Sequence, residues 1–363
     1  MMRESTDEFH YSDYLQLDVV LNAQSPESGR GDQEIHDETL FIIAHQVHEL
    51  WFKEILHELK SVLALFSSVP LDAQKIGLIA ARLGRLVAIQ KIINRQIEVL
   101  ETISPLDFLD LRDYLFSDAV FQSSQFREIE LRLGLATRVT PESFNHFSPE
   151  ESETLRKACE EKTLFEAVDE WLANMPFRSI EGGEFWPGYR RIVHDMLQKD
   201  YRLVENNRRL SGWDRQGQLS KLENARYRFD ALFKPEEYEL LRDEGLFQFR
   251  QAAVLSALFL LLYRDEPFLQ VPFRILKRLM DVDDQLIGWR INRSLFEQHM
   301  LGNKVGLGGS ISHDYVREMM EEKRIFRDLG ILTTFLVPRS SLPVLPQRLK
   351  QRLDVHFSHR PAG

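Results

Sequence analysis

The chain has 363 residues, of which 43% are hydrophobic and 28% charged, so it can bury one large core or two modest ones. Its 18 glycines and 14 prolines are fewer than average usage would give a chain of this length, which excludes collagen-like, low-complexity and disordered classes. The formal net charge is -10 and no long basic block occurs, so we expect no nucleic-acid partner.

We expect a cytoplasmic protein with no membrane partner. The single Cys159 cannot form an intramolecular disulfide, and residues 1–30 lack the apolar core of a signal peptide. The most apolar stretch, residues 252–263, lies between two arginines and falls short of the ~20 residues that a membrane span requires.

Helical periodicity dominates the chain and strand-like alternation is almost absent, which predicts an all-α fold. Residues 1–36 are polar and read as an N-terminal arm that contributes to a pocket. Residues 37–363 read as a single all-α domain. Within that domain, residues 140–210 are the most irregular and are predicted to be a peripheral insertion.

The predicted helices follow in chain order. A helix over residues 37–66 is entered by an Asp N-cap, and a second covers residues 72–101. Gly134 is a plausible C-cap for a helix after residue 120, and residues 215–263 read as helical. Pro272 is predicted to open a long helix that ends near Leu301. The expected inner stripe of the first helix consists of Leu40, Ile43, Val47, Leu50, Trp51 and Ile55.

The sequence FIIAHQVHELWF places two histidines and two aromatic rings on one helix face. Phe41, His45, His48 and Phe52 are spaced at i, i+4, i+7 and i+11. A histidine there can act as acid, base or hydrogen-bond partner near neutral pH, or it can be a buried residue satisfied by a carbonyl. His45 and His48 could also chelate a metal. An ExxH pair occurs in the same helix, but no second pair follows to complete a di-iron site.

Two further stretches could bind a ligand. In SPLDFLDLRDYLF, Phe108 and Arg112 share one face, which suits a ligand with an aromatic ring and a carboxylate, although an interhelix salt bridge explains the arginine equally well. The glycine-rich run GNKVGLGGS is weak evidence for an anion cradle and lacks the pattern of a nucleotide-binding loop.

Arg293 lies in the middle of an apolar stripe of the long predicted helix. A buried guanidinium must find a carboxylate, a cluster of carbonyls or a ligand anion, because leaving it unpaired is very costly. The alternative is that its side chain extends to the rim of the core.

Taken together, these stretches resemble the tryptophan 2,3-dioxygenase family over nearly the whole chain. The matching segments are YSDYLQLD, HDETLFIIAHQVHELWFKEILHEL, SPLDFLDLRDYL, FQSSQFREIE, LLYRDEPFLQVPFRILKRLMDVDDQLIGWR and LGNKVGLGGS. The resemblance implies an all-α homotetramer that binds haem b. It also implies insertion of both atoms of O2 across the indole C2–C3 bond of tryptophan, which gives N-formylkynurenine and belongs to tryptophan catabolism by the kynurenine pathway.

The resemblance assigns roles by motif position. His45 is similar to the distal histidine that contacts the indole nitrogen, and Arg112 to the arginine that binds the substrate carboxylate. The remaining matches are Phe41 and Phe108 as walls of the indole pocket, and Tyr11 and Tyr14 as N-terminal tyrosines that reach into a neighbouring subunit's site.

The sequence departs from the family pattern at the iron ligand. Where the family has the axial histidine two residues after WR, this chain reads WRINR and has Arg293. Arginine is a poor iron ligand because its guanidinium stays protonated. His299 and His48 are weak substitute ligands, and His299 points about 120° away from the Arg293 direction on an ideal helix.

Two departures fall on the substrate side. The family's GTGGSSG reads GLGGSIS, so Leu307, next to Gly308, replaces the threonine that meets the substrate's amino group. The family's SG before FQS is Ala119-Val120, which puts a branched side chain beside the haem pocket.

The sequence leaves three hypotheses. The first is O2-dependent ring opening or oxygenation of L-tryptophan or a related indole or aromatic amino acid. The second is a diverged enzyme with a rebuilt site, in which Arg293 binds an anion and a non-haem metal lies elsewhere, at His45 and His48 for example. The third is a non-catalytic protein that binds an aromatic amino acid.

Overall fold

The structure is a computed structural model that describes residues 10–30, 35–69, 71–112, 123–135, 144, 147–175, 185–302, 324–347 and 349–351. All regular secondary structure within these ranges is helical, so the predicted all-α class is confirmed. No helix in the same ranges is long and apolar enough to cross a membrane.

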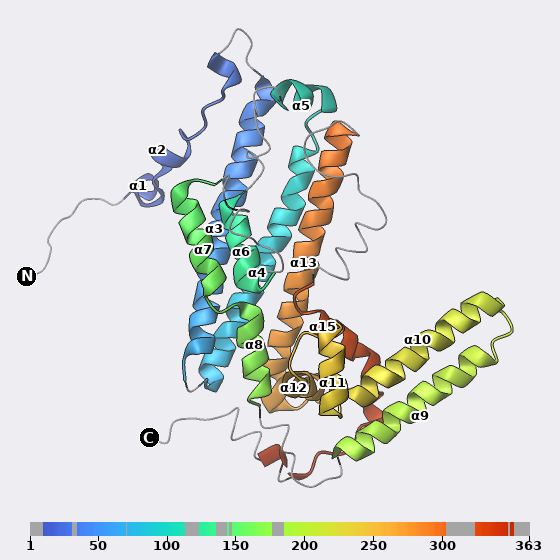
Figure 1. Ribbon diagram of the computed structural model, residues 1–363. Helices are drawn as coiled ribbons and strands as arrows, with labels where there is room; N and C mark the ends of the chain where they lie inside the picture. The colour runs from blue at the N-terminus through green and yellow to red at the C-terminus, as the bar shows by residue number, and fades with distance from the viewer. Residues whose placement is uncertain are drawn as a thin grey trace, which may run out of the picture.

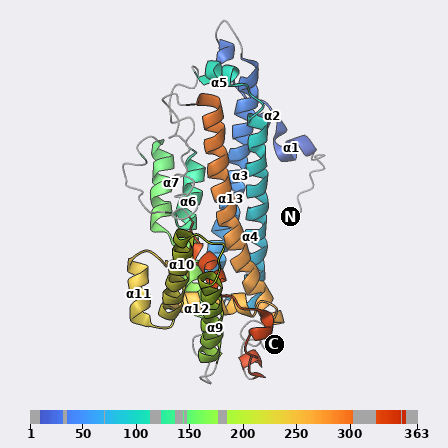
Figure 2. The ribbon, with the colours of Figure 1, turned by 90° about the vertical axis from the view of Figure 1, so that its right-hand side faces the viewer.

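Three long helices form the body of the molecule. They are α3 (His36–Ser67), α4 (Ala73–Leu100) and α13 (Gln270–Leu301), and they run side by side (Figures 1 and 2). The closest packing in the fold is of α4 against α13 and against α3. The shorter α6 (Ser124–Leu133) packs on α3, and α5 (Pro105–Arg112) covers one end of the bundle (Figure 1).

The Asp N-cap predicted for the first long helix is wrong, because Ile35 occupies the N-cap position of α3 and makes no side-chain cap hydrogen bond. The Asp72 side chain caps α4 by accepting a 2.9 Å hydrogen bond from the Lys75 N–H, and Gly134 ends α6 in the left-handed region at φ 115°. The long helix α13 begins at Gln270, so Pro272 lies in its first turn as predicted.

The stripe predicted for α3 is only partly confirmed, because Ile55 is buried and Leu40 and Trp51 pack on the core while two other members are exposed. Ile43 and Leu50 are 42% and 54% exposed, whereas Phe41, His48 and Phe52 are buried. Apolar residues follow the helical period on both sides of this helix, and packing against α4 and α6 selects the side that carries Phe41 and Phe52. The face that bears the histidines is therefore the inner face of α3.

The second half of the chain is broken into shorter helices. The stretch predicted as one helical region over residues 215–263 consists of three, because Pro235 starts a new helix and Gly245 adopts φ 72°. These are α10 (Gly212–Ala231), α11 (Pro235–Asp243) and α12 (Gln251–Leu262). With α9 (Phe185–Glu205), α10 forms a hairpin that extends away from the body (Figure 1).

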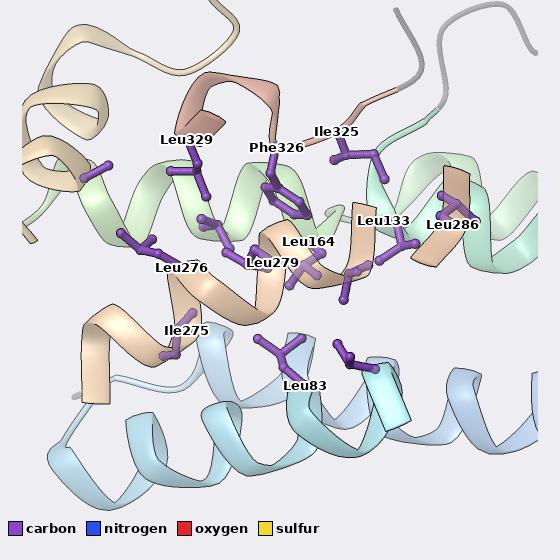
Figure 3. Close-up of a cluster of buried hydrophobic side chains, with 14 of the residues drawn as sticks. Leu83, Leu133, Leu164, Ile275, Leu276, Leu279, Leu286, Ile325, Phe326 and Leu329 are labelled. Carbon is purple, nitrogen blue, oxygen red and sulfur yellow. The ribbon is translucent and has the colours of Figure 1, made fainter. Parts of the chain in front are cut away.

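Helices that precede and follow this hairpin in the sequence complete the core. The short α8 (Leu164–Ala173) packs on α12 and α3, and α7 (Pro149–Glu160) packs on α6. The buried cluster in Figure 3 joins Leu83 of α4, Leu164 of α8 and Leu279 of α13 to Phe326, which precedes α15 (Arg327–Leu332). The N-terminal helices α1 (Tyr11–Leu15) and α2 (Leu17–Val20) lie outside the bundle in both views (Figures 1 and 2).

Candidate functional site

A cavity of about 210 Å³ lies at the end of the bundle that α5 covers. It is smaller than the ~300–1,000 Å³ pockets that bury drug-sized ligands, so its size suits a small aromatic molecule. Most of its lining is apolar or aromatic, with a few polar groups. The described lining residues are His45, His48, Glu49, Phe52, Ile97, Leu100, Phe108, Ser123, Phe126, Trp289, Arg293, Phe296 and Glu297.

His45 lines this cavity as a neutral imidazole. Its Nδ1 lies 2.8 Å from the carbonyl oxygen of Phe41, one turn earlier in α3. A carbonyl can only accept, so Nδ1 carries the proton and Nε2 is left with its lone pair. Burial lowers the pKa of His45, and the charge of Arg293 lowers it further. The ring is therefore a neutral acceptor at neutral pH, and it is packed against Phe41 with ring centroids 4.1 Å apart.

His48 is a second neutral imidazole in the cavity wall. Burial is the main cause that lowers its pKa to about 4, with contributions from His45 and Arg293. Its ring meets Trp289 edge-on at 5.0 Å between centroids. Its Nε2 is buried and has no hydrogen-bond partner among the described residues, which is an unusual state for a buried polar atom.

Aromatic side chains from four helices form the rest of the pocket. Phe108 of α5 is buried and meets Phe296 of α13 edge-on, with ring centroids 5.7 Å apart. Phe126 of α6 and Phe52 of α3 lie 5.4 Å apart and both contact Trp289. These rings offer edges and faces against which a flat ligand can pack.

Arg293 finds a carboxylate on its own helix. Its Nε donates to Glu297 Oε1 over 3.1 Å, one turn further along α13, and both residues line the cavity. The side chains are 35% and 19% exposed. Burial raises the pKa of Glu297, and the Arg293 charge opposes that effect. Of the outcomes that the sequence left open, the pairing with a carboxylate is the one observed.

Ion pairs on the outer side of the pocket fix α6 against its neighbours. Arg290 of α13 bonds to Glu130 of α6, and Glu130 also accepts from Arg127 over 2.9 Å. The Gln125 amide donates to Glu49 Oε2 over 2.7 Å, which joins α6 to α3. These contacts hold the helices that carry Trp289 and His48 in register.

Other residues predicted for the site are not among the described lining residues of the cavity. Phe41 is buried behind His45, and Arg112, the last residue of α5, is half-buried and is not among the described lining residues. Tyr11 and Tyr14 are exposed on α1. The exposed His299 does not line the cavity. Leu307, Gly308, Ala119 and Val120 lie outside the described residues.

The sequence analysis did not single out several lining residues. Glu297 could have been found, because it follows Arg293 by four residues on a predicted helix, the spacing at which opposite charges pair. Phe126 and Ser123 carry no such signal, because they reach the cavity through the packing of α6 on α3.

Comparison of the sequence with known proteins shows which family the chain belongs to. The sequence matches the tryptophan 2,3-dioxygenase family over residues 2–336. The chain belongs to that family. It is 41% identical to the tryptophan 2,3-dioxygenase of Bdellovibrio bacteriovorus, over 96% of this chain and 98% of that protein. Identity to the tryptophan 2,3-dioxygenase of Alteromonas mediterranea is 39%, over 98% and 100% of the two chains. Tryptophan 2,3-dioxygenase B of Danio rerio is 39% identical, over 92% and 84%.

The donor set does not fit the haem that the resemblance to the tryptophan 2,3-dioxygenase family implies. Arg293 stands at the position of the axial ligand, and its guanidinium is protonated and bonded to Glu297. No group of three or more His, Cys, Asp or Glu side chains among the described residues could hold a metal ion. At the position where the family has its axial histidine, α13 therefore offers no ligand for haem iron.

Proposed function

We propose that this protein acts on L-tryptophan or a related indole or aromatic amino acid, in an O2-dependent oxygenation of the tryptophan 2,3-dioxygenase type. The observation that carries the proposal is the neutral His45, which lines an aromatic cavity in a chain of this family. The near full-length similarity to tryptophan 2,3-dioxygenases supports the same reaction class.

The residues of the chain provide binding and orientation. An indole N–H donates to Nε2 of His45, while Nδ1 stays bound to the Phe41 carbonyl and keeps the ring in one tautomer. Phe108 and Phe296 pack against the indole ring and exclude water. For the carboxylate, Arg112 is the candidate by motif and Arg293 is the arginine that lines the cavity.

Haem b is the cofactor that the family resemblance implies, and the residues at the axial position disagree with it. No reaction step is therefore assigned to haem in this chain. The Arg293–Glu297 pair favours a second candidate function, which is binding of an aromatic amino acid without turnover.

The expected oligomeric state and cellular location also come from the resemblance to the family. We expect a homotetramer in the cytoplasm, in which Tyr11 and Tyr14 of one subunit approach the cavity of a neighbour. Their exposure on α1, outside the bundle, is compatible with such a role. Light scattering of the full chain, compared with a variant that lacks residues 1–20, measures the assembly.

The function is tested with the full chain, prepared with and without added haem, L-tryptophan and O2. N-formylkynurenine formation with matching O2 uptake supports oxygenation, and His45→Phe should reduce the rate more than tenfold. Calorimetric binding of L-tryptophan without product or O2 uptake supports the second candidate. Absence of both binding and product overturns both functions.

A further inference from the structure

The Arg293–Glu297 pair belongs to the described lining of the cavity, and a site for a flat apolar ring does not require it. We propose that this pair is a subsite for the charged head of a free aromatic α-amino acid. The guanidinium of Arg293 pairs with the ligand's α-carboxylate, and the carboxylate of Glu297 pairs with its α-ammonium group. The inference rests on the proposed ligand class but not on turnover.

The placement of the two charges matches such a head. An α-amino acid carries its ammonium and carboxylate groups on the same carbon atom, so the two charges are close together. Arg293 and Glu297 lie one turn apart on α13, are joined through Nε and Oε1 at 3.1 Å, and both line the cavity. A ligand can therefore meet both charges from one position.

When the ligand binds, Arg293 and Glu297 each pair with a charged group of the ligand, and the net charge of the site stays the same. In the protein alone, Arg293 and Glu297 neutralise each other. A zwitterion adds no net charge, so each side chain can gain an opposite charge without leaving the other exposed to a like one. A deaminated acid brings only a negative charge next to Glu297, and a decarboxylated amine brings only a positive charge next to Arg293. The subsite should therefore select amino acids over both analogues.

Burial strengthens this preference. Glu297 is 19% exposed, and burial raises its pKa because its charge is only partly compensated in that environment. A cationic ammonium adds compensation that water does not provide there. Arg293 supplies a planar fork of N–H donors that suits a carboxylate.

Other residues of the cavity wall suit the ring of the same ligand. His48 is 4% exposed, and its Nε2 has no hydrogen-bond partner among the described residues. With the neutral ring in the tautomer that leaves Nε2 unprotonated, this atom is an acceptor, alternative to Nε2 of His45, for the single N–H or O–H donor of the ligand's ring. Trp289 and Phe52 contact the His48 ring and provide the adjoining apolar surface. The ligand class is thus an aromatic amino acid with a hydrogen-bond donor on its ring.

Binding measured by calorimetry on the full chain tests the subsite, with L-tryptophan, indole-3-propionate and tryptamine as probes. We expect L-tryptophan to bind at least tenfold more tightly than either analogue. Arg293→Gln should weaken L-tryptophan about 10- to 100-fold, the range for a lost hydrogen bond to a charged group. Glu297→Gln should weaken L-tryptophan similarly but strengthen indole-3-propionate, because it removes a like charge.

Arg112→Gln is the matched control, since Arg112 is the other arginine proposed for the carboxylate. If Arg112→Gln abolishes binding while Arg293→Gln and Glu297→Gln leave it unchanged, the subsite is overturned and the proposed function stands. If the wild-type chain forms no complex with L-tryptophan, the proposed ligand class fails as well. Thermal melting checks that each variant is folded, and Arg293→Lys and Glu297→Asp replace any variant that is not.

Discussion

The imidazole of His48 meets the indole of Trp289 edge-on, with 5.0 Å between the ring centroids, and so joins α3 to α13 in the cavity wall. Burial between the two helices lowers the pKa of His48 to about 4, so the ring is uncharged at neutral pH. The contact therefore links the protonation of one side chain to the packing of the two helices.

Unfolding should depend on pH through His48. Its pKa is about 4 in the folded chain and about 6.5 when unfolded, so the unfolded state binds more protons between these values. Stability from this group is complete above pH 6.5 and falls as the pH drops towards 4, by about 3 kcal/mol in all. Urea unfolding at pH 7 and pH 4.5 measures the loss. His48→Phe should remove most of the pH dependence of the free energy of unfolding. His299→Gln, which changes an exposed histidine, should leave that pH dependence as it is. An equal pH dependence in the wild type and both variants would contradict the assignment to His48.

The Glu130–Arg290 pair should be a strong contributor to the packing of α6 on α13. The two side chains are only 10% and 14% exposed, so Glu130→Ala leaves a mostly buried guanidinium without its carboxylate. We expect a loss of about 3 kcal/mol in the free energy of unfolding. Glu237→Ala, which breaks the exposed pair with Lys234, is the control and should cost less than about 1 kcal/mol. Equal losses in the two variants would mean that burial does not decide the effect.

Two glycine-to-alanine substitutions should change the stability of the fold in opposite directions. Gly134 has φ 115°, and an added Cβ would lie 2.8 Å from Cβ of Phe165, so Gly134→Ala is expected to destabilise the fold by more than about 1 kcal/mol. Gly77 lies inside α4 with open space around it, so Gly77→Ala should stabilise by up to about 1 kcal/mol. Melting temperatures measure both changes, and a shift in the same direction for both variants would refute the comparison.

Haem binding should respond to residue 293. Arg293→His restores the residue type that the family has as its axial ligand, so this variant should gain a haem absorption band when produced with excess haem precursor. The wild-type chain should not gain a band that depends on α13. Ser294→His is the control, because the next residue along the helix points about 100° away. A band of equal strength in the wild type and in Arg293→His would show that residue 293 does not determine haem binding.

The sequence predicted those features that depend on periodicity along one helix. The position of Arg293 on the inner side of α13 and the cap at Gly134 are of this kind. The inner face of α3 was only partly predicted, because two apolar faces compete and only the packing of other helices chooses between them. Which residues of α5 line the cavity likewise depends on how this helix lies across the bundle end, which no local pattern encodes.

Arg293 and Glu297 follow each other along the axis of a single helix, so the direction from positive to negative charge is fixed by the chain direction of α13. The aromatic wall then gives a third point of reference that does not lie on that line. Three fixed points of contact distinguish a molecule from its mirror image. A pocket of this kind should prefer one enantiomer of its guest, and the preference should vanish once either charge is removed.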